Sequence, residues 1–459
     1  MRPPQSNPDI HNNAVEACPE AFTIQRGADC PLTSKEAVAF GGSDTILLMF
    51  YREHLLPFLF PFYRPSLLQG GRAWILEMMI SSPVVRRATL CQSSYFFSLG
   101  ARNGQARCDL GDGAHADPGC LWGAEAGAAG YRWLRHHRTS ARRCTDHGRY
   151  HAGAAFRDCC LELSNCQAPL NAALALFRQL LDGRSSFNAV MSRLGPPSWI
   201  LPANCGAVPS AEQAAFRFSS ALLIFDDIIA GTVLQEQPRL YEHHRSLLGN
   251  IDRTEAPINL EAALGCQNWA LLQIGEIAVL DAWKQRRKRA GNLDVMELVH
   301  RASAIKNSLE AHLTSLETDP VIISKGGSSM LASSLVTRVW THAAYIYLFV
   351  VVSGWQPASV DVRYHVGRIV ELLTRQISPP TLLCTTVWPF CVAGCLAEPA
   401  QEAHLRGMVE ALQPPSLFGT VRKALEIMEN VWRNRDSGDA ANRDIATCFR
   451  SEGDLILLV

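Results

Sequence analysis

The segment GCQNWALLQIGEIAVLDAWKQ (265–285) decides the fold class, because its apolar residues fall on more than one side of a helix. A helix that is apolar on several sides must be surrounded by other elements. Two later segments, VWTHAAYIYLFVVVSGWQP (339–357) and VWPFCVAGCLA (387–397), are equally rich in tryptophan and aliphatic residues. We therefore predict an all-α fold. The tryptophans that we expect to be mostly buried are Trp269, Trp283, Trp340, Trp355 and Trp388.

Four further segments repeat apolar residues at helical spacing. In the first, Pro83 stands in the first turn and Gly100 can end the helix. In the third, Ser210 and Gln213 fit a capping box and Gly231 follows the helix. The four apolar stripes are Val84, Ala88, Cys91, Tyr95 and Leu99; Leu170, Leu174, Phe177 and Leu181; Ala215, Phe218, Leu222, Phe225 and Ile229; and Val421, Leu425, Met428 and Trp432.

These patterns divide the chain into three parts. Residues 1–42 are polar and contain prolines, so we expect disorder there. Residues 43–436 form one large helical domain, and 437–459 a tail. Inside the domain, 101–160 contain no Ile, Val, Lys or Met but many Arg, Gly, His and Cys residues. This stretch is either an insertion or a segment translated in the wrong frame. We favour the second interpretation, because helical periodicity resumes abruptly after residue 160.

Composition excludes several classes of protein. The 43 basic and 43 acidic residues balance, whereas a protein that mainly grips nucleic-acid backbone usually carries excess positive charge. The first residues lack the apolar core of a signal peptide. The longest apolar run, 343–352, is shorter than the roughly 20 residues that cross a bilayer, so we expect a buried helix and no membrane partner. The 15 cysteines are then expected as reduced thiols.

Cysteine and histidine are dense enough in one region to raise the question of zinc. No pair there has the C-x2-C spacing of structural zinc sites, and Cys391 and Cys395, four residues apart, are better explained by core packing. A zinc binuclear cluster needs six cysteines with such pairs, so we expect no DNA-reading module of that kind, no metal site and no cofactor. The crowded residues are Cys108, His115, Cys120, His136, His137, Cys144, His147, His151, Cys159 and Cys160.

Two adjacent carboxylates, Asp226 and Asp227, lie in the apolar segment LLIFDDIIAGT (222–232). Charges within an apolar run are costly and suggest function. The segment resembles the aspartate-rich helix of terpene synthases, which binds diphosphate through magnesium. That motif has a third acidic residue where this chain has Ala230, and no second metal motif is evident. The other interpretation is that both side chains flank the apolar stripe and face solvent or pair locally.

Other catalytic patterns are weaker. The chain has no G-x-S-x-G and no Gly-rich phosphate loop before a helix. We expect His243 and His244 to be exposed. Glu276 and Asp281 are better explained as buried partners of arginine or backbone groups than as an acid and base. We therefore predict no catalytic residues and no enzyme.

A basic run ends the central segment just before Gly291. One interpretation is structural, because cations favour the negative end of a helix and glycine can close it. The other is a nuclear-import patch. The residues of the run are Lys284, Arg286, Arg287, Lys288 and Arg289.

Eight segments together resemble the fungal-specific transcription factor domain, the regulatory domain found after the zinc cluster of fungal transcription factors. The resemblance covers about 44–100 and 161–436. The segments are LLMFYREHLLPFLFPF (47–62), AALALFRQLL (172–181), FSSALLIFDDIIA (218–230), PRLYEHHRSLL (238–248), GCQNWALLQIGEIAVLDAWK (265–284), RVWTHAAYIYLFVVVSGWQP (338–357), VWPFCVAGC (387–395) and FGTVRKALEIMENVWRNRD (418–436).

The resemblance implies an α-helical regulator that acts in the nucleus on a gene set such as a secondary-metabolite biosynthetic cluster. It identifies no catalytic, cofactor-binding, metal-binding or DNA-binding residues, and it assigns Asp226 and Asp227 to a structural helix. The partner that we expect is the transcription machinery or a DNA-binding protein, with a homodimer as one option for the oligomeric state. DNA would be reached only indirectly or through a missing N-terminal module. An upstream exon, a co-regulator role and a degenerate locus remain open explanations.

Overall fold

The fold was analysed in a computed structural model. It describes residues 41–66, 71–108, 163–182, 187–194, 199–200, 207–249, 256–318, 328–377, 380–435, 443–451 and 454–458. The chain divides into two units, Met1–Ala39 and Phe40–Val459, and every described element belongs to the second. Most of the N-terminal segment expected to be disordered, and most of 101–160, lie outside the described residues. Gly42 already begins the first helix.

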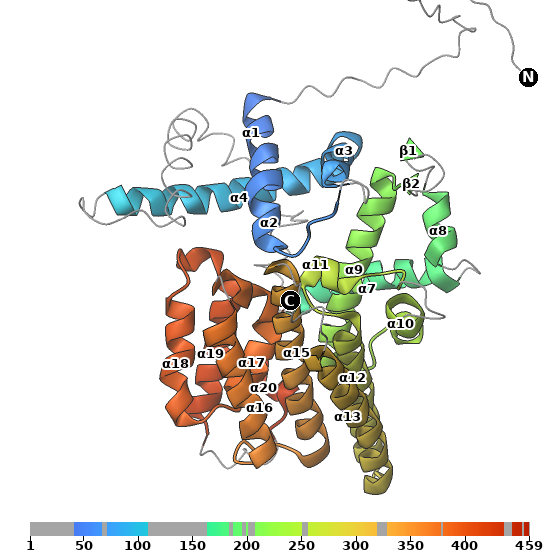
Figure 1. Ribbon diagram of the computed structural model, residues 1–459, viewed down its shortest axis with the longest axis vertical. Coiled ribbons are helices and arrows are strands. Elements are labelled where there is room, and N and C mark those ends of the chain that lie inside the picture. The colour runs from blue at the N-terminus through green and yellow to red at the C-terminus, as the bar shows by residue number, and fades with distance from the viewer. Residues whose placement is uncertain are drawn as a thin grey trace, which may run out of the picture. The chain divides into compact units, whose positions relative to one another are not determined.

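Helices dominate the described residues, which confirms the all-α prediction (Figure 1). The only strands among them form two antiparallel pairs, with Trp199 opposite Val208 and Arg450 opposite Leu455. In chain order the elements are α1 (Gly42–Phe50), the π-helix η1 (Tyr51–Leu55), α2 (Leu56–Leu59), α3 (Ala73–Ser81), α4 (Pro83–Cys108), α7 (Leu163–Asp182), α8 (Phe187–Arg193), β1 (Trp199–Ile200), β2 (Ala207–Val208), α9 (Ala211–Leu234), α10 (Tyr241–Leu248), α11 (Leu260–Leu264), α12 (Asn268–Arg289), α13 (Val295–Thr318), α15 (Ser328–Ser353), α16 (Val360–Glu371), the π-helix η4 (Leu372–Gln376), the 3-10 helix η5 (Pro380–Thr386), α17 (Val387–Cys395), α18 (Pro399–Glu410), the 3-10 helix η6 (Pro415–Leu417), α19 (Gly419–Arg433), α20 (Ile445–Cys448), β3 (Arg450–Ser451) and β4 (Asp454–Leu455).

The main core is built around α12, as the opening segment predicts. This helix packs against α9, α13 and α15, and α15 in turn packs against α16 and α17 (Figure 1). Leu271, Ile274 and Ile277 of α12 are fully buried. The stretch Met330–Ser353 has the length and hydropathy of a membrane span, but 72% of its apolar window is buried inside the fold. That burial is typical of a core helix, as we expected for this segment.

The five tryptophans divide into two groups. Trp340 and Trp388 are 2% and 0% exposed, and their rings stack at 5.7 Å. The other three are half-buried and pack against the main core, which agrees with the prediction of mostly buried rings. Polar and charged side chains cover their outer faces. His312 stacks on Trp269, Arg301 lies over Trp283 and Arg443 lies over Trp355.

Three of the four predicted stripes face the interior. Those of α7 and α19 are buried apart from Leu181 and Leu425, which are half-buried. The stripe of α9 is buried at its C-terminal end, and its predicted capping box is present. We expected Gly231 to follow the end of α9, and this expectation is wrong. The helix continues to Leu234 and turns at Gln235, whose φ is 54°, while Gly231 lies against Pro238, whose Cγ would be 2.9 Å from an added Cβ.

The stripe predicted for α4 is wrong. The helix continues past Gly100 to Cys108, and Val84, Cys91 and Tyr95 are exposed. The buried face carries Gln92 and Phe96 instead, because α4 packs against α1 and α3 through that side.

The segment 437–459, which we expected to be a tail, contributes to the main core. Ile445, Phe449 and Ile456 are buried there. The Gln235 amide donates to Asp444 at 3.1 Å, which joins this segment to the end of α9. The described helical fold thus includes residues close to the C-terminus.

Candidate functional site

The predicted basic patch lies in the last turn of α12. Its residues 286–289 are exposed, and Ala290 ends the helix before Gly291, whose φ is 67°. Lys284 is half-buried instead, and its Nζ donates to the carbonyl of Val351 on α15. Burial lowers the pKa of Lys284 from its ordinary value, opposed by the nearby Asp281 carboxylate. Lys284 therefore supports the core, and only 286–289 form a surface patch.

Asp227 is a structural residue in this fold. Its side chain is 2% exposed, and its two oxygens accept the backbone N–H groups of Arg239 and Leu240, both at 2.9 Å. These N–H groups immediately precede α10, so Asp227 holds the start of that helix against α9. Of our two local alternatives, pairing is correct and solvent exposure is wrong for this residue. Asp226 is half-buried.

The cavity beside Asp227 is small. It has a volume of about 20 Å³ and is lined by α7, α9 and the turn before α10. A cavity of this size holds about one water molecule. A prenyl diphosphate does not fit there. Within the part of the chain that the structure describes, no three His, Cys, Asp or Glu side chains are grouped to hold a metal ion.

His244 is fully buried, so our expectation of an exposed residue is wrong. Its Nε2 lies 3.5 Å from Asp227, and its ring faces Gly275 of α12, where an added Cβ would lie 3.4 Å from Nδ1. His243 is half-buried, with Nε2 3.1 Å from Asp182. A sequence signal for the burial of His244 did exist, because it lies three residues before Leu247 on the apolar face of α10.

Glu276 is half-buried and pairs with an arginine, as predicted, whereas the buried Asp281 pairs with glutamine and tyrosine side chains in place of arginine or backbone groups. Glu276 accepts from Tyr241 at 2.7 Å and from Arg245 at 2.9 Å. Asp281 is buried and accepts from Gln285, Gln235 and Tyr347 at 3.2–3.3 Å. Burial raises the pKa of Asp281, and the hydrogen bonds from Gln285 and Gln235 oppose that shift. Neither carboxylate lines the small cavity beside Asp227 or the one beside Trp340 and Trp388.

The structure describes only some of the cysteines for which we made predictions. Cys391 and Cys395 are buried in α17, which agrees with core packing, and Cys448 joins them from α20. A hydrogen bond with Cys391, together with burial, raises the pKa of the Cys395 thiol. The cysteines and histidines of 109–160 lie outside the described residues, and so does the side chain of Cys108.

Sequence reasoning missed one polar pair, His342 of α15 and His365 of α16. Their Nδ1 atoms lie 2.9 Å apart, so one ring donates and the other accepts. His342 is 2% exposed, and the Tyr345 ring stacks on His365 at 4.5 Å. No local motif marks such a pair, because its members are 23 residues apart and meet only when the two helices pack.

Comparison with known proteins gives a consistent family assignment. The family model of the fungal specific transcription factor domain matches residues 156–458. Transcription factor dibT of Pestalotiopsis microspora is 33% identical over 457 residues, which cover 90% of this chain and 70% of that protein.

Two further relatives are more distant. The ustiloxin B cluster transcription factor ustR of Aspergillus flavus is 29% identical over 275 residues, covering 58% of this chain and 46% of that protein. The trichothecene biosynthesis transcription regulator TRI10 of Trichoderma arundinaceum is 26% identical over 424 residues, covering 85% and 91%. No solved structure matches this chain.

Proposed function

Because this chain belongs to the fungal specific transcription factor domain family, we propose that it regulates the genes of a secondary-metabolite biosynthetic cluster. The observation that carries the proposal is the extent of the family match, which spans the helical core from α7 to the buried C-terminal segment. Relatives named as regulators of ustiloxin B and trichothecene biosynthesis support the kind of target.

The test is deletion of the gene followed by transcript sequencing. We expect the transcripts of a contiguous biosynthetic cluster to fall, and reintroduction of the intact gene to restore them. A deletion strain whose only change is the missing transcript itself would contradict the proposal.

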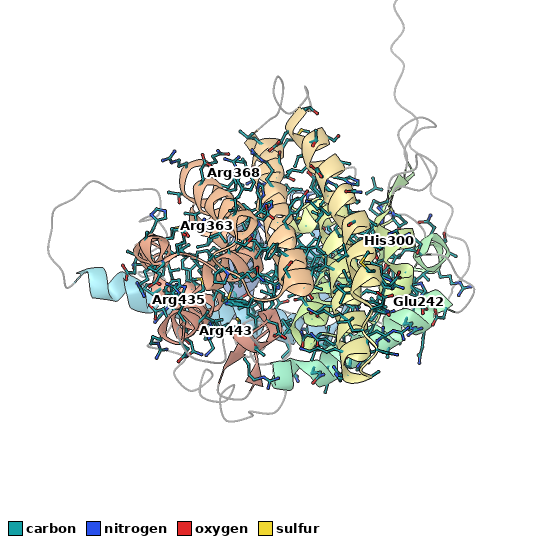
Figure 2. All side chains as sticks on the ribbon, turned by 90° about the horizontal axis from the view of Figure 1, so that it is seen from below. Glu242, His300, Arg363, Arg368, Arg435 and Arg443 are labelled. Atoms are coloured by element: carbon teal, nitrogen blue, oxygen red, sulfur yellow. The ribbon has the colours of Figure 1, made fainter. Side chains whose placement is uncertain are left out.

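The proposed site of action is the nucleus, with entry through the patch 286–289 or through a partner that carries the protein in. Exposure of these four residues supports the first route, and their position at the negative end of α12 supports the purely structural interpretation. Changing all four to alanine in a fluorescent fusion separates the two. Loss of nuclear signal supports an import patch, whereas an unchanged signal supports the structural interpretation. Alanine at Arg363 and Arg368 of α16 is the matched control (Figure 2).

We further propose that the protein is not an enzyme. The occupied oxygens of Asp227 and the small cavity beside it argue against magnesium-diphosphate chemistry at this helix. Purified protein incubated with farnesyl diphosphate and magnesium should release no product above a no-protein control. Product formation that Asp226→Asn abolishes would support the terpene synthase alternative instead.

The proposed partners are the transcription machinery or a DNA-binding protein, and a second copy of the chain in a homodimer. Family membership supports a regulatory partner. Analytical ultracentrifugation of the purified chain tests the homodimer, and a monomer at every concentration would exclude it.

A further inference from the structure

An open cleft of about 410 Å³ lies beside the π-helix η1, and three arginines line it. Arg52 comes from η1, Arg64 from the segment after α2, and Arg72 from the residue before α3. Small-molecule sites have volumes of about 300–1,000 Å³, so the cleft is of the right size for a metabolite. Single π-helical turns are also frequent at functional sites.

The charge of this cleft selects for anions. Its charged lining residues are the three arginines and one carboxylate, Glu53, so the formal balance is two positive charges. Glu53 pairs with Arg52, with Oε1 2.7 Å from both Nε and Nη2. The Arg52–Glu53 pair is an example of carboxylate binding by a guanidinium of this cleft. Glu53 therefore competes for Arg52 with any anion that enters the cleft.

Backbone contacts hold two of the guanidinium groups in place. Arg72 donates through Nη2 to the Tyr63 carbonyl at 2.8 Å, and Arg64 donates through Nε to the Pro61 carbonyl at 3.2 Å. A guanidinium has five N–H donors, so each of these contacts leaves donors for a ligand. Because these guanidinium groups are already held in place, ligand binding loses less side-chain entropy.

An aromatic cluster adjoins the residues that line the cleft, because Tyr63 precedes Arg64 and Trp74 follows Ala73. Trp74 donates to the Tyr63 hydroxyl at 2.8 Å, and the Tyr63 ring lies 4.4 Å from that of Phe218 on α9. Arg72 therefore connects the cleft directly to a residue that packs on α9. Gly71, which also lines the cleft, has a φ of 55°, a conformation that favours glycine.

We propose that this cleft binds a small dianionic metabolite through its carboxylate or phosphate oxygens, with Arg52, Arg64 and Arg72 as the ligand-binding residues. Arginine suits this task because its planar fork matches both kinds of oxyanion. The site lies outside the matched region 156–458 and goes beyond the proposed control of a gene cluster, so either proposal can fail without the other.

Isothermal titration of the intact 459-residue chain with succinate and with inorganic phosphate, both mainly dianions at mildly alkaline pH and at matched ionic strength, tests this site. We expect saturable 1:1 binding of at least one probe, and the stronger probe distinguishes a carboxylate ligand from a phosphate ligand. Arg64→Gln and Arg52→Gln should each weaken binding about tenfold or more, since each removes a charge-assisted hydrogen bond. Glu53→Gln should instead tighten binding, because it removes the competing carboxylate.

The matched control is Arg363→Gln, which removes an exposed arginine that also pairs with a glutamate, Glu398, but lies on α16. Its affinity should equal that of the unchanged protein. Circular dichroism of each variant confirms that it is folded. The proposal is overturned if neither probe binds saturably, if Arg64→Gln and Arg363→Gln bind alike, or if Glu53→Gln binds no tighter.

Discussion

At the scale of single residues, Trp340 has the packing expected of a core aromatic. Its ring stacks on Trp388, meets Phe225 edge to face at 5.6 Å, and its Nε1 donates to the Thr385 carbonyl at 3.2 Å. Trp340→Ala should lower the free energy of unfolding by about 3–5 kcal/mol, measured by urea denaturation. Trp355→Ala, at a half-buried ring, is the control and should cost clearly less. Equal losses in both variants would contradict this account.

The pair His342 and His365 makes a pH-dependent contribution to stability. Burial, reinforced by His365, Arg368 and Arg338, lowers the pKa of His342 to about 3. Burial also lowers the pKa of His365 to about 4, with Asp361 opposing the shift and Lys306 reinforcing it. In the unfolded chain the pKa of a histidine is about 6.5. Between these values the unfolded state binds more protons, so the free energy of unfolding falls as pH drops below about 6.5.

His342→Gln should therefore make the loss of stability between about pH 6.5 and pH 4 less steep, because it removes one of the two buried titrating groups. The measurement is the denaturation midpoint across that pH range. His300→Gln, on the exposed side of α13, is the control and should leave the steepness unchanged (Figure 2). A pH profile of His342→Gln that follows the unchanged protein would show that this pair contributes no pH dependence.

At the scale of elements, α17 and α19 pack closely enough to require glycine at position 394. An added Cβ there would overlap the Met428 sulfur and lie 2.9 Å from its Cγ, and Trp432 donates to the Gly394 carbonyl at 2.8 Å. Gly394→Ala should thus lower the free energy of unfolding by about 1–3 kcal/mol through overpacking. Gly367→Ala in α16 is the matched control, because nothing lies within 4 Å of its added Cβ.

The two glycine substitutions should change the free energy of unfolding in opposite directions. At position 367 alanine brings only its higher helix propensity, worth up to about 1 kcal/mol, so the control should be stabilised. Thermal denaturation followed by circular dichroism measures both. If Gly394→Ala is as stable as the unchanged protein, α17 and α19 are not packed as closely as the structure indicates.

The elements also show how far sequence reasoning reaches. Periodicity predicted α7 and α19 and their buried faces, and local chemistry predicted the Ser210 capping box of α9, because each signal is contained within its own helix. The same method chose the wrong face of α4. That helix carries apolar side chains on both sides, and only its contact with α1 decides that Phe96 is buried and Tyr95 exposed.

The candidate site was predicted less completely than the fold, for the same reason. The basic run was visible in the sequence, but the half-buried state of Lys284 depends on Val351 of another helix. His244 lies on the apolar face of α10, but its contact with Gly275 forms only when α10 packs on α12. The arginine cleft joins residues 52, 64 and 72, which form no local motif and converge only once η1 and α3 are in place.

At the scale of the whole molecule, the balanced charge of the chain bears on how it could reach DNA. Its basic and acidic residues are equal in number at 43 each, and no two of its 15 cysteines have the C-x2-C spacing that a zinc cluster requires. Sequence selectivity needs side chains that contact base edges in addition to phosphates.

The chain of 459 residues alone should therefore show no selective binding to a cluster promoter in a gel-shift assay at physiological salt. Adding nuclear extract should produce a selective complex that contains the protein, whereas a scrambled promoter should not. Selective binding by the purified chain without extract would show that it carries its own reader.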